Sequence, residues 1–259
     1  MSVRKPAVSG LFYPANEEDL SESVSRYIAT STSFDHKPKA IIAPHAGYIY
    51  SGPIAGVAYS ALRNSAKHIS KVVLLGPSHR VGFRGIAVPS SDVFSTPLGN
   101  IVVDADNLAK LALLPQVITL DSAHAQEHSL EVHLPFLQRR LDRFELTPLV
   151  IGDADAESVA EVLELLWGGE ETLLVISTDL SHYHDYVTAI DIDAATTREI
   201  LALHHGLTGD QACGCKGVNG LLLLAGRKGM HISCLAQANS GDTAGDKRRV
   251  VGYASYVLY

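Results

Sequence analysis

Short apolar runs alternate with helix-like stretches along most of this 259-residue chain. The runs at residues 39–43, 71–75 and 173–177 have the length and the β-branched content of buried strands, whereas residues 17–30 and 51–65 show helical spacing of apolar positions. Strands that alternate with helices form βαβ units, in which helices cover both faces of a sheet. The sequence therefore predicts an α/β fold with a mixed, mostly parallel sheet flanked by helices.

No segment of the chain looks like a domain boundary. We find no internal repeat, no low-complexity segment and no Pro/Gly/Ser-rich linker, so we expect a single domain over residues 1–259. The longest apolar run, residues 221–225, is far shorter than the roughly 20 residues that cross a bilayer. The N-terminus has basic residues but lacks the apolar core of a signal peptide. We therefore expect a cytoplasmic protein without membrane contact.

The charge of the chain bears on its binding partners, and its cysteine content bears on disulfide formation. The formal net charge is −7, and the one dense basic cluster, residues 247–249, lies next to Asp242 and Asp246. A nucleic-acid binder usually carries a basic face, so we expect no nucleic-acid partner. Three cysteines give an odd count without a framework spacing, which argues against structural disulfides.

Histidine or carboxylate side chains follow four of the predicted strands within a few residues. The strands at residues 39–43, 71–75, 173–177 and 231–236 are followed, in chain order, by His45, by His79, by Asp179 and His182, and by Asp242. In open α/β sheets, ligands bind outside the carboxyl ends of the strands. If the four strands are parallel, these side chains converge on one edge of the sheet.

Such a convergence predicts a metal site. Two imidazoles and one carboxylate, with other positions open, form the facial arrangement of non-haem iron(II), and zinc can occupy the same set. We assign His45, His79 and Asp242 as ligands, and His182 as a catalytic base oriented by Asp179. The alternatives are an ordinary turn at Asp242 and plain loop histidines with satisfied hydrogen bonds.

Further residues near these strand ends are candidates for substrate binding. Tyr48 can form an aromatic wall or pack in the core, and Ser78 can donate a hydrogen bond to a substrate oxygen or cap a helix. His128 and His133 would lie about 140° apart on a helix, which does not match the i, i+4 pair of helical zinc proteases. They therefore line the pocket or form a structural hydrogen-bonded cluster.

Five ordered motifs resemble the Memo family across essentially the whole chain: "PHAGYIYSG", "LGPSH", "EHSLEVHLPFL", "STDLSHYH" and "NSGDTAGD". Prokaryotic members of that family are often called the B protein of the AmmeMemoRadiSam system, and its fold is similar to the catalytic subunit of class III extradiol dioxygenases. The resemblance implies histidine ligands at His45 and His79, and a base at His182. It also implies that Cys213 lies near the pocket. Where the dioxygenases have a glutamate and some animal members a cysteine, this chain offers Asp242, a carboxylate that favours iron(II), whereas a thiolate favours copper(I).

Three functions fit these observations. The first is an iron-dependent redox enzyme, similar to a dioxygenase, that acts on a small substrate. The second is a non-catalytic module that binds a peptide or a metabolite, together with AmmeMemoRadiSam partner proteins. The third is a zinc hydrolase that uses the same ligands to activate water.

Overall fold

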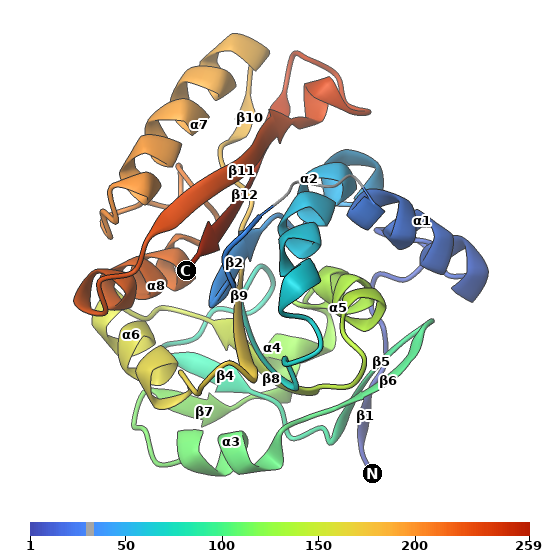
Figure 1. Cartoon of the computed structure of the whole chain (residues 1–259), viewed down its shortest axis with the longest axis vertical. Helices are drawn as coiled ribbons and strands as arrows, with labels where there is room; N and C mark the ends of the chain where they lie inside the picture. Colours follow the sequence, from blue (N-terminus) through green and yellow to red (C-terminus); the bar gives the residue numbers. More distant parts are fainter. Residues whose placement is uncertain (30–33) are drawn as a thin grey trace.

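A computed structural model describes residues 1–29 and 34–259 of the chain, and within them a nine-stranded sheet forms the centre of the fold (Figure 1). Its strand order is β10-β12-β2-β9-β3-β8-β4-β7, and β11 pairs with the other side of β12. The strands are β2 (Ala40–Ala43), β3 (Lys71–Pro77), β4 (Ile86–Val88), β7 (Val117–Thr119), β8 (Glu145–Ile151), β9 (Thr172–Ser177), β10 (His182–His184), β11 (Ile232–Asn239) and β12 (Val250–Leu258).

The middle of this sheet is parallel and its margins are mixed. The neighbouring strands β2, β9, β3 and β8 run parallel, whereas β4 is antiparallel to β8 and β12 is antiparallel to β2, β10 and β11. The carboxyl ends of the four parallel strands therefore share one edge. The prediction of an α/β fold with a mixed, mostly parallel sheet is confirmed.

Helices cover both faces of the sheet (Figure 1). One face carries α1 (Glu17–Ala29), α2 (Tyr48–Ser60) and α5 (Leu134–Arg140), and the other carries α6 (Ala156–Leu165) and α8 (Cys215–Arg227). The long helix α7 (Tyr186–Leu201) packs on β11 and β12. The short helices α3 (Ala105–Leu111) and α4 (Asp121–Ala125) complete the α-helices of the described residues.

The pleat of the strands explains this two-sided packing. In β2, Ile41 belongs to the core under α1 and α2, whereas Ile42 belongs to the core under α6 and α8. In β9, Val175 and Ile176 divide in the same way. Because successive side chains of a strand point to opposite faces, a strand buried on both faces must be apolar throughout.

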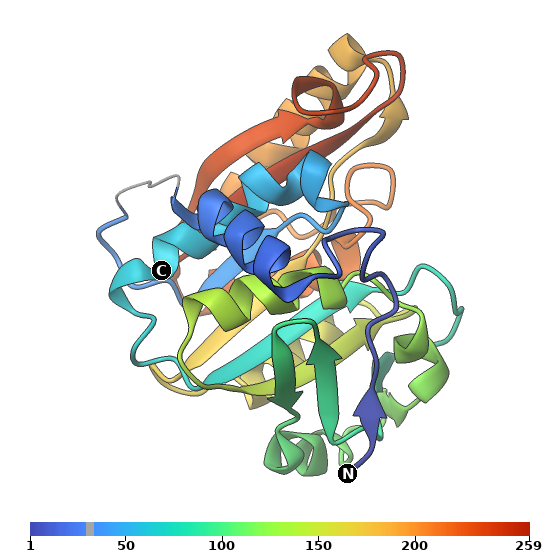
Figure 2. The ribbon, with the colours of Figure 1, turned by 90° about the vertical axis from the view of Figure 1, so that its right-hand side faces the viewer.

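A smaller three-stranded sheet, β1 (Val3–Arg4), β5 (Val93–Thr96) and β6 (Gly99–Val102), lies apart from the main sheet near the N-terminus (Figure 2). The buried carboxylate of Glu131 anchors this region, because it pairs with Arg4 and accepts hydrogen bonds from Tyr13 Oη at 2.6 Å and from Ala7 N at 2.7 Å. Glu131, in the middle of "HSLEVH", is therefore a structural residue.

Helix boundaries differ in part from those predicted. Asn16 caps α1, since its side chain accepts hydrogen bonds from Glu18 N and Asp19 N. Helix α2 begins at Tyr48, before the predicted start at Ser51. His128 and His133 do not share one helix, because the chain becomes helical only at the 3-10 turn η2 (Glu131–His133), which continues into α5. No helix among the described residues is long and apolar enough to cross a membrane.

Candidate metal centre

Three histidines come together at the carboxyl edge of the parallel strands. His45 follows β2, His79 follows β3, and His128 lies in the loop before η2. One nitrogen from each ring lies within 4.8 Å of the other two. His45 is buried, His128 is half-buried and His79 is the most open of the three. This arrangement can hold a metal ion, because imidazole is a ligand for zinc, copper and iron.

The carboxylate of Glu127 fixes two of these histidines. It accepts hydrogen bonds from His79 Nδ1 at 2.8 Å, from the backbone N–H of His79 at 2.6 Å and from the backbone N–H of His128 at 2.9 Å. Burial alone would raise the pKa of Glu127, but the His79 ring and its charge, together with the backbone N–H groups of His79 and Ser129, lower it to about 2. A carboxylate behind Nδ1 leaves Nε2 of His79 with its lone pair available, as in carboxylate–histidine–metal triads.

The hydroxyl of Ser177, the last residue of β9, fixes the third histidine. Ser177 Oγ lies 2.6 Å from the carbonyl oxygen of Ser129 and 2.6 Å from His45 Nδ1. A carbonyl oxygen can only accept, so the single hydroxyl proton goes to Ser129 and the oxygen must accept from His45 Nδ1. His45 Nε2 then carries no proton and presents its lone pair to the cluster.

The same hydroxyl ties His133 into a buried chain. His133 Nε2 lies 2.9 Å from Ser177 Oγ, and its Nδ1 lies 2.8 Å from Tyr59 Oη. By the same count of protons, His133 donates to Ser177 and accepts from the Tyr59 hydroxyl. Burial lowers the pKa of His133 to about 3, so this ring is neutral at physiological pH. His133 therefore supports the cluster from behind.

A thiol and a carboxyl border the cluster. Cys213 Sγ lies 3.3 Å from His45 Nε2, and Asp179 Oδ2 lies 3.9 Å from the same nitrogen. Burial raises the pKa of the Cys213 thiol and, for Asp179, raises the pKa to about 7. Without a cation the thiol is protonated and can donate to the free Nε2 lone pair. A bound metal would replace that proton.

The cluster opens into a cleft of about 1300 Å³. His182 and Asp179, predicted above as a base and its partner, line this cleft together with the three histidines. Burial lowers the pKa of His182, so the ring is neutral near pH 7 and can accept a proton. No hydrogen bond or ion pair joins Asp179 to His182 among the described residues, and Asp179 Oδ1 instead accepts the backbone N–H of His45 at 2.8 Å.

The structure does not bring Asp242 to the cluster. Its carboxylate accepts hydrogen bonds from Tyr186 Oη and from the backbone N–H of Asn239, within a capping box. The reason lies in the topology: Asp242 follows β11, and β12 lies between β11 and β2. His128, assigned above to substrate binding, takes the third place in the cluster.

Of the remaining residues predicted to bind substrate, Cys213 lines the cleft, whereas Tyr48 and Ser78 do not. Tyr48 lies in the core, where its hydroxyl donates to the carbonyl oxygen of Val132, so it packs rather than lining the cleft. The Ser78 hydroxyl donates to the carbonyl oxygen of Val81. Cys213 lines the cleft, as the family resemblance implied.

A model of the Memo family, described as "Memo-like protein", matches residues 4–257 of this chain. The chain belongs to the Memo family. It is similar to the MEMO1 family protein of Aquifex aeolicus, at 35% identity over the whole length of both chains. It is also similar to the MEMO1 family protein of Thermoplasma volcanium, at 34% identity over 98% of each chain. The quoted histidine motifs are thus those of a Memo-family protein.

Among solved structures, an uncharacterized protein from Escherichia coli K12 matches with a TM-score of 0.49 and 13% identity, covering 86% of this chain and 100% of that one. A match at this distance carries no argument about function.

Sequence reasoning missed two residues that hold the Memo-family site together. Ser177 gave no signal, because a serine at a strand end is common. Glu127 stands directly before His128 in "EHSLEVH". Since metal-binding histidines usually have an acidic partner, that adjacency was the available signal.

Proposed function

We propose that this Memo-family chain is a metal-dependent enzyme, with a non-haem iron(II) centre at His45, His79 and His128 and redox activity on a small substrate. One observation carries the proposal: each of the three rings has a hydrogen-bond acceptor near Nδ1. Ser177 fills this role for His45, and Glu127 fills it for His79 and lies 3.3 Å from His128 Nδ1. Three Nε2 atoms are thereby left to face a common ion.

Nearby oxygen and sulfur donors fit such an ion. Non-haem iron(II) is commonly held by imidazoles and a carboxylate, and the Asp179 carboxyl borders the cluster where Asp242 had been expected. Bound iron(II) would supply electron transfer and draw a polar substrate group to the site. His182, neutral and in the same cleft, would take the proton of a substrate hydroxyl. The buried wall around His45 would limit access of water.

A zinc hydrolase is the second candidate, and the ligand set itself favours it. Three histidines with an open position form a known catalytic zinc arrangement, in which the bound water ionises near pH 7.

Copper is a third candidate metal, after iron and zinc, because the Cys213 thiol offers a soft donor 3.3 Å from His45 Nε2. A cleft of about 1300 Å³ would also suit a non-catalytic module that binds a peptide within the AmmeMemoRadiSam system.

Activity of separately loaded samples distinguishes these functions. Protein purified without oxygen is loaded with iron(II) or with zinc, and oxygen uptake with catechols is compared with the hydrolysis of simple esters. The proposal predicts oxygen uptake by the iron form, and a loss of at least about a hundredfold in His182→Gln. Hydrolysis by the zinc form alone would establish the second candidate. Peptide binding unaffected by metal removal, with neither activity, would establish the binding module.

A further inference from the structure

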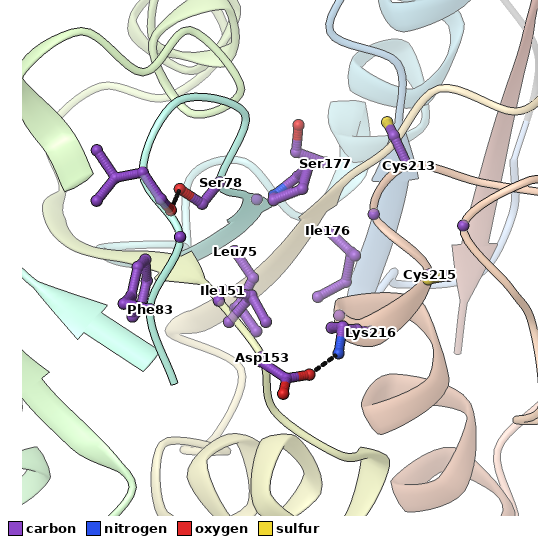
Figure 3. A pocket seen from close by; sticks show the side chains of 18 residues that line it. Leu75, Ser78, Phe83, Ile151, Asp153, Ile176, Ser177, Cys213, Cys215 and Lys216 are labelled. Atoms are coloured by element: carbon purple, nitrogen blue, oxygen red, sulfur yellow. Dashed lines mark hydrogen bonds and ion pairs between the residues drawn. The ribbon is translucent and has the colours of Figure 1, made fainter. Parts of the chain in front are cut away.

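A second, smaller cavity lies directly beside the metal centre. Its volume is about 420 Å³, and it sits at the carboxyl ends of β3, β8 and β9, next to the start of α8. In Figure 3 the apolar side chains of Leu75, Ile151 and Ile176 lie together, with Phe83 to one side. A volume of this size suits a small molecule, since ligand pockets range from roughly 300 to 1,000 Å³.

The cavity and the cleft share two lining residues, Gly209 and Cys213. Cys213 faces both spaces, and its sulfur lies 3.3 Å from His45 Nε2. A single residue therefore separates the apolar cavity from the nitrogen of a candidate metal ligand. A molecule held in the cavity would be within one side chain of the cluster.

The charged residues of the lining offer an ionic occupant no free partner. Among the described residues that line the cavity, only Asp153 and Lys216 are charged, and they pair with each other through Lys216 Nζ and Asp153 Oδ1 at 2.5 Å (Figure 3). Both side chains are exposed, at 74% and 43%, so the pair lies at the mouth. The rest of the lining is mostly apolar side chains and glycine, and the hydroxyls of Ser78 and Ser177 already donate to backbone carbonyl oxygens, so the walls favour an uncharged apolar group.

We propose that this cavity binds the apolar body of a small-molecule ligand whose polar end reaches the histidine cluster past Cys213. The binding of the polar end rests on the proposed function, because it needs the metal. The binding of the apolar body in the cavity needs no metal. The ligand class is therefore a neutral molecule with an aliphatic or aromatic body and one metal-binding head.

Two glycines of α8 provide a matched pair of variants. A side chain at Gly217 would start 3.4 Å from Ile176, at the cavity wall, whereas one at Gly226 would have no atom within 4 Å. Gly217→Leu therefore fills the cavity, and Gly226→Leu makes the same change on the exposed end of the same helix. Ile151, a buried side chain of the cavity lining, gives a second filling variant, Ile151→Phe.

Titration of the metal-free protein with the neutral fluorescent probe N-phenyl-1-naphthylamine tests the cavity alone. We expect saturable binding by the parent and by Gly226→Leu, and an affinity lower by at least about tenfold in the two filling variants, each checked for a folded state by thermal unfolding. Equal affinity in all folded proteins would overturn the proposal. If Gly217→Leu does not fold, Ile151→Phe gives the decision.

A hydroxamate series on the cobalt(II)-loaded protein tests the link to the metal. Octanohydroxamate is expected to bind at least about tenfold more tightly than acetohydroxamate, because each buried methylene contributes about fourfold. That gain should disappear in Gly217→Leu and persist in Gly226→Leu. A chain-length gain that Gly217→Leu retains would overturn the inference and leave the metal centre standing. Failure of either hydroxamate to change the cobalt spectrum would instead count against the proposed function.

Discussion

Ser177 Oγ and His45 Nδ1 lie 2.6 Å apart, and this contact determines which nitrogen of His45 faces the candidate metal. The Ser177 proton is committed to the carbonyl oxygen of Ser129, so His45 must donate through Nδ1. Residues 132 positions apart in the sequence thereby fix the tautomer that metal binding requires.

Ser177→Ala should weaken metal binding by about 10- to 100-fold, the usual effect of removing a partner behind a metal ligand. Nitrogen NMR of the metal-free protein, labelled at histidine, should also show a changed tautomer population for His45. Ser255→Ala removes another buried hydroxyl, which donates to the carbonyl oxygen of Ile54, and should change neither quantity. Unchanged affinity and an unchanged His45 tautomer in Ser177→Ala would refute this role.

Glu127→Gln should lower metal affinity by at least about tenfold, because an amide is a weaker acceptor than a carboxylate for His79 Nδ1. Competition with a chelator measures this change. Glu157→Gln, which alters an exposed ion pair with Arg227, serves as the control and should leave metal affinity as it is. Equal effects of both variants would show that Glu127 has no special relation to the metal.

Asp179→Asn should change how stability depends on pH in the metal-free protein. Burial raises the pKa of Asp179 from 3.8 to about 7, so the folded state holds this proton more tightly than the unfolded state does. The contribution of this tighter proton binding to the free energy of unfolding is complete below pH 4 and is lost as the pH rises towards 7. Between pH 4 and pH 8, the free energy of unfolding of the variant should therefore rise by on the order of 3 kcal/mol relative to that of the parent.

Urea unfolding at several pH values tests this, and the difference between the two proteins isolates Asp179 from the histidines. Parallel curves, with a constant difference from pH 4 to 8, would show that the carboxyl ionises normally in the fold.

Gly252→Ala should destabilise the protein by at least about 2 kcal/mol, because the added Cβ would overlap the buried Asp193 carboxylate. Gly252 lies in β12, and the backbones of Gly252 and Ser181 bond next to His182, so the damage would reach the cleft. Gly226→Ala meets no atom within 4 Å and should be neutral or slightly stabilising. Calorimetry on both variants gives the comparison, and equal melting temperatures would contradict the packing.

The sequence was sufficient to predict the sheet and the meeting of His45 and His79, because apolar strands followed by polar turns have a local signature. It was not sufficient for Asp242, whose position depends on β12 lying between β11 and β2. No local pattern marks which strand comes between two others. His128 was recognised as a residue near the pocket, but its place in the cluster depends on a loop conformation that Glu127 stabilises.

The hydrogen bonds that support the histidine cluster could not be predicted from the sequence, for a related reason. The bonds from Ser177 to His45 and to His133 connect residues 132 and 44 positions apart, and each depends on the register of the sheet. Periodicity shows which side chains are buried, but it does not show which buried polar groups meet. Buried serine and histidine therefore became interpretable only once their partners were known.

Metal content after anaerobic purification and iron(II) loading tests whether His45, His79 and His128 hold an ion. It should be measured for the parent, for the alanine variants of His45, His79 and His128, and for Asp242→Ala as the matched control. We expect near-stoichiometric iron in the parent and in Asp242→Ala, and its loss in all three histidine variants. An iron-free parent, or a His128→Ala protein that keeps its metal while Asp242→Ala loses it, would show that the three histidines do not form the iron site.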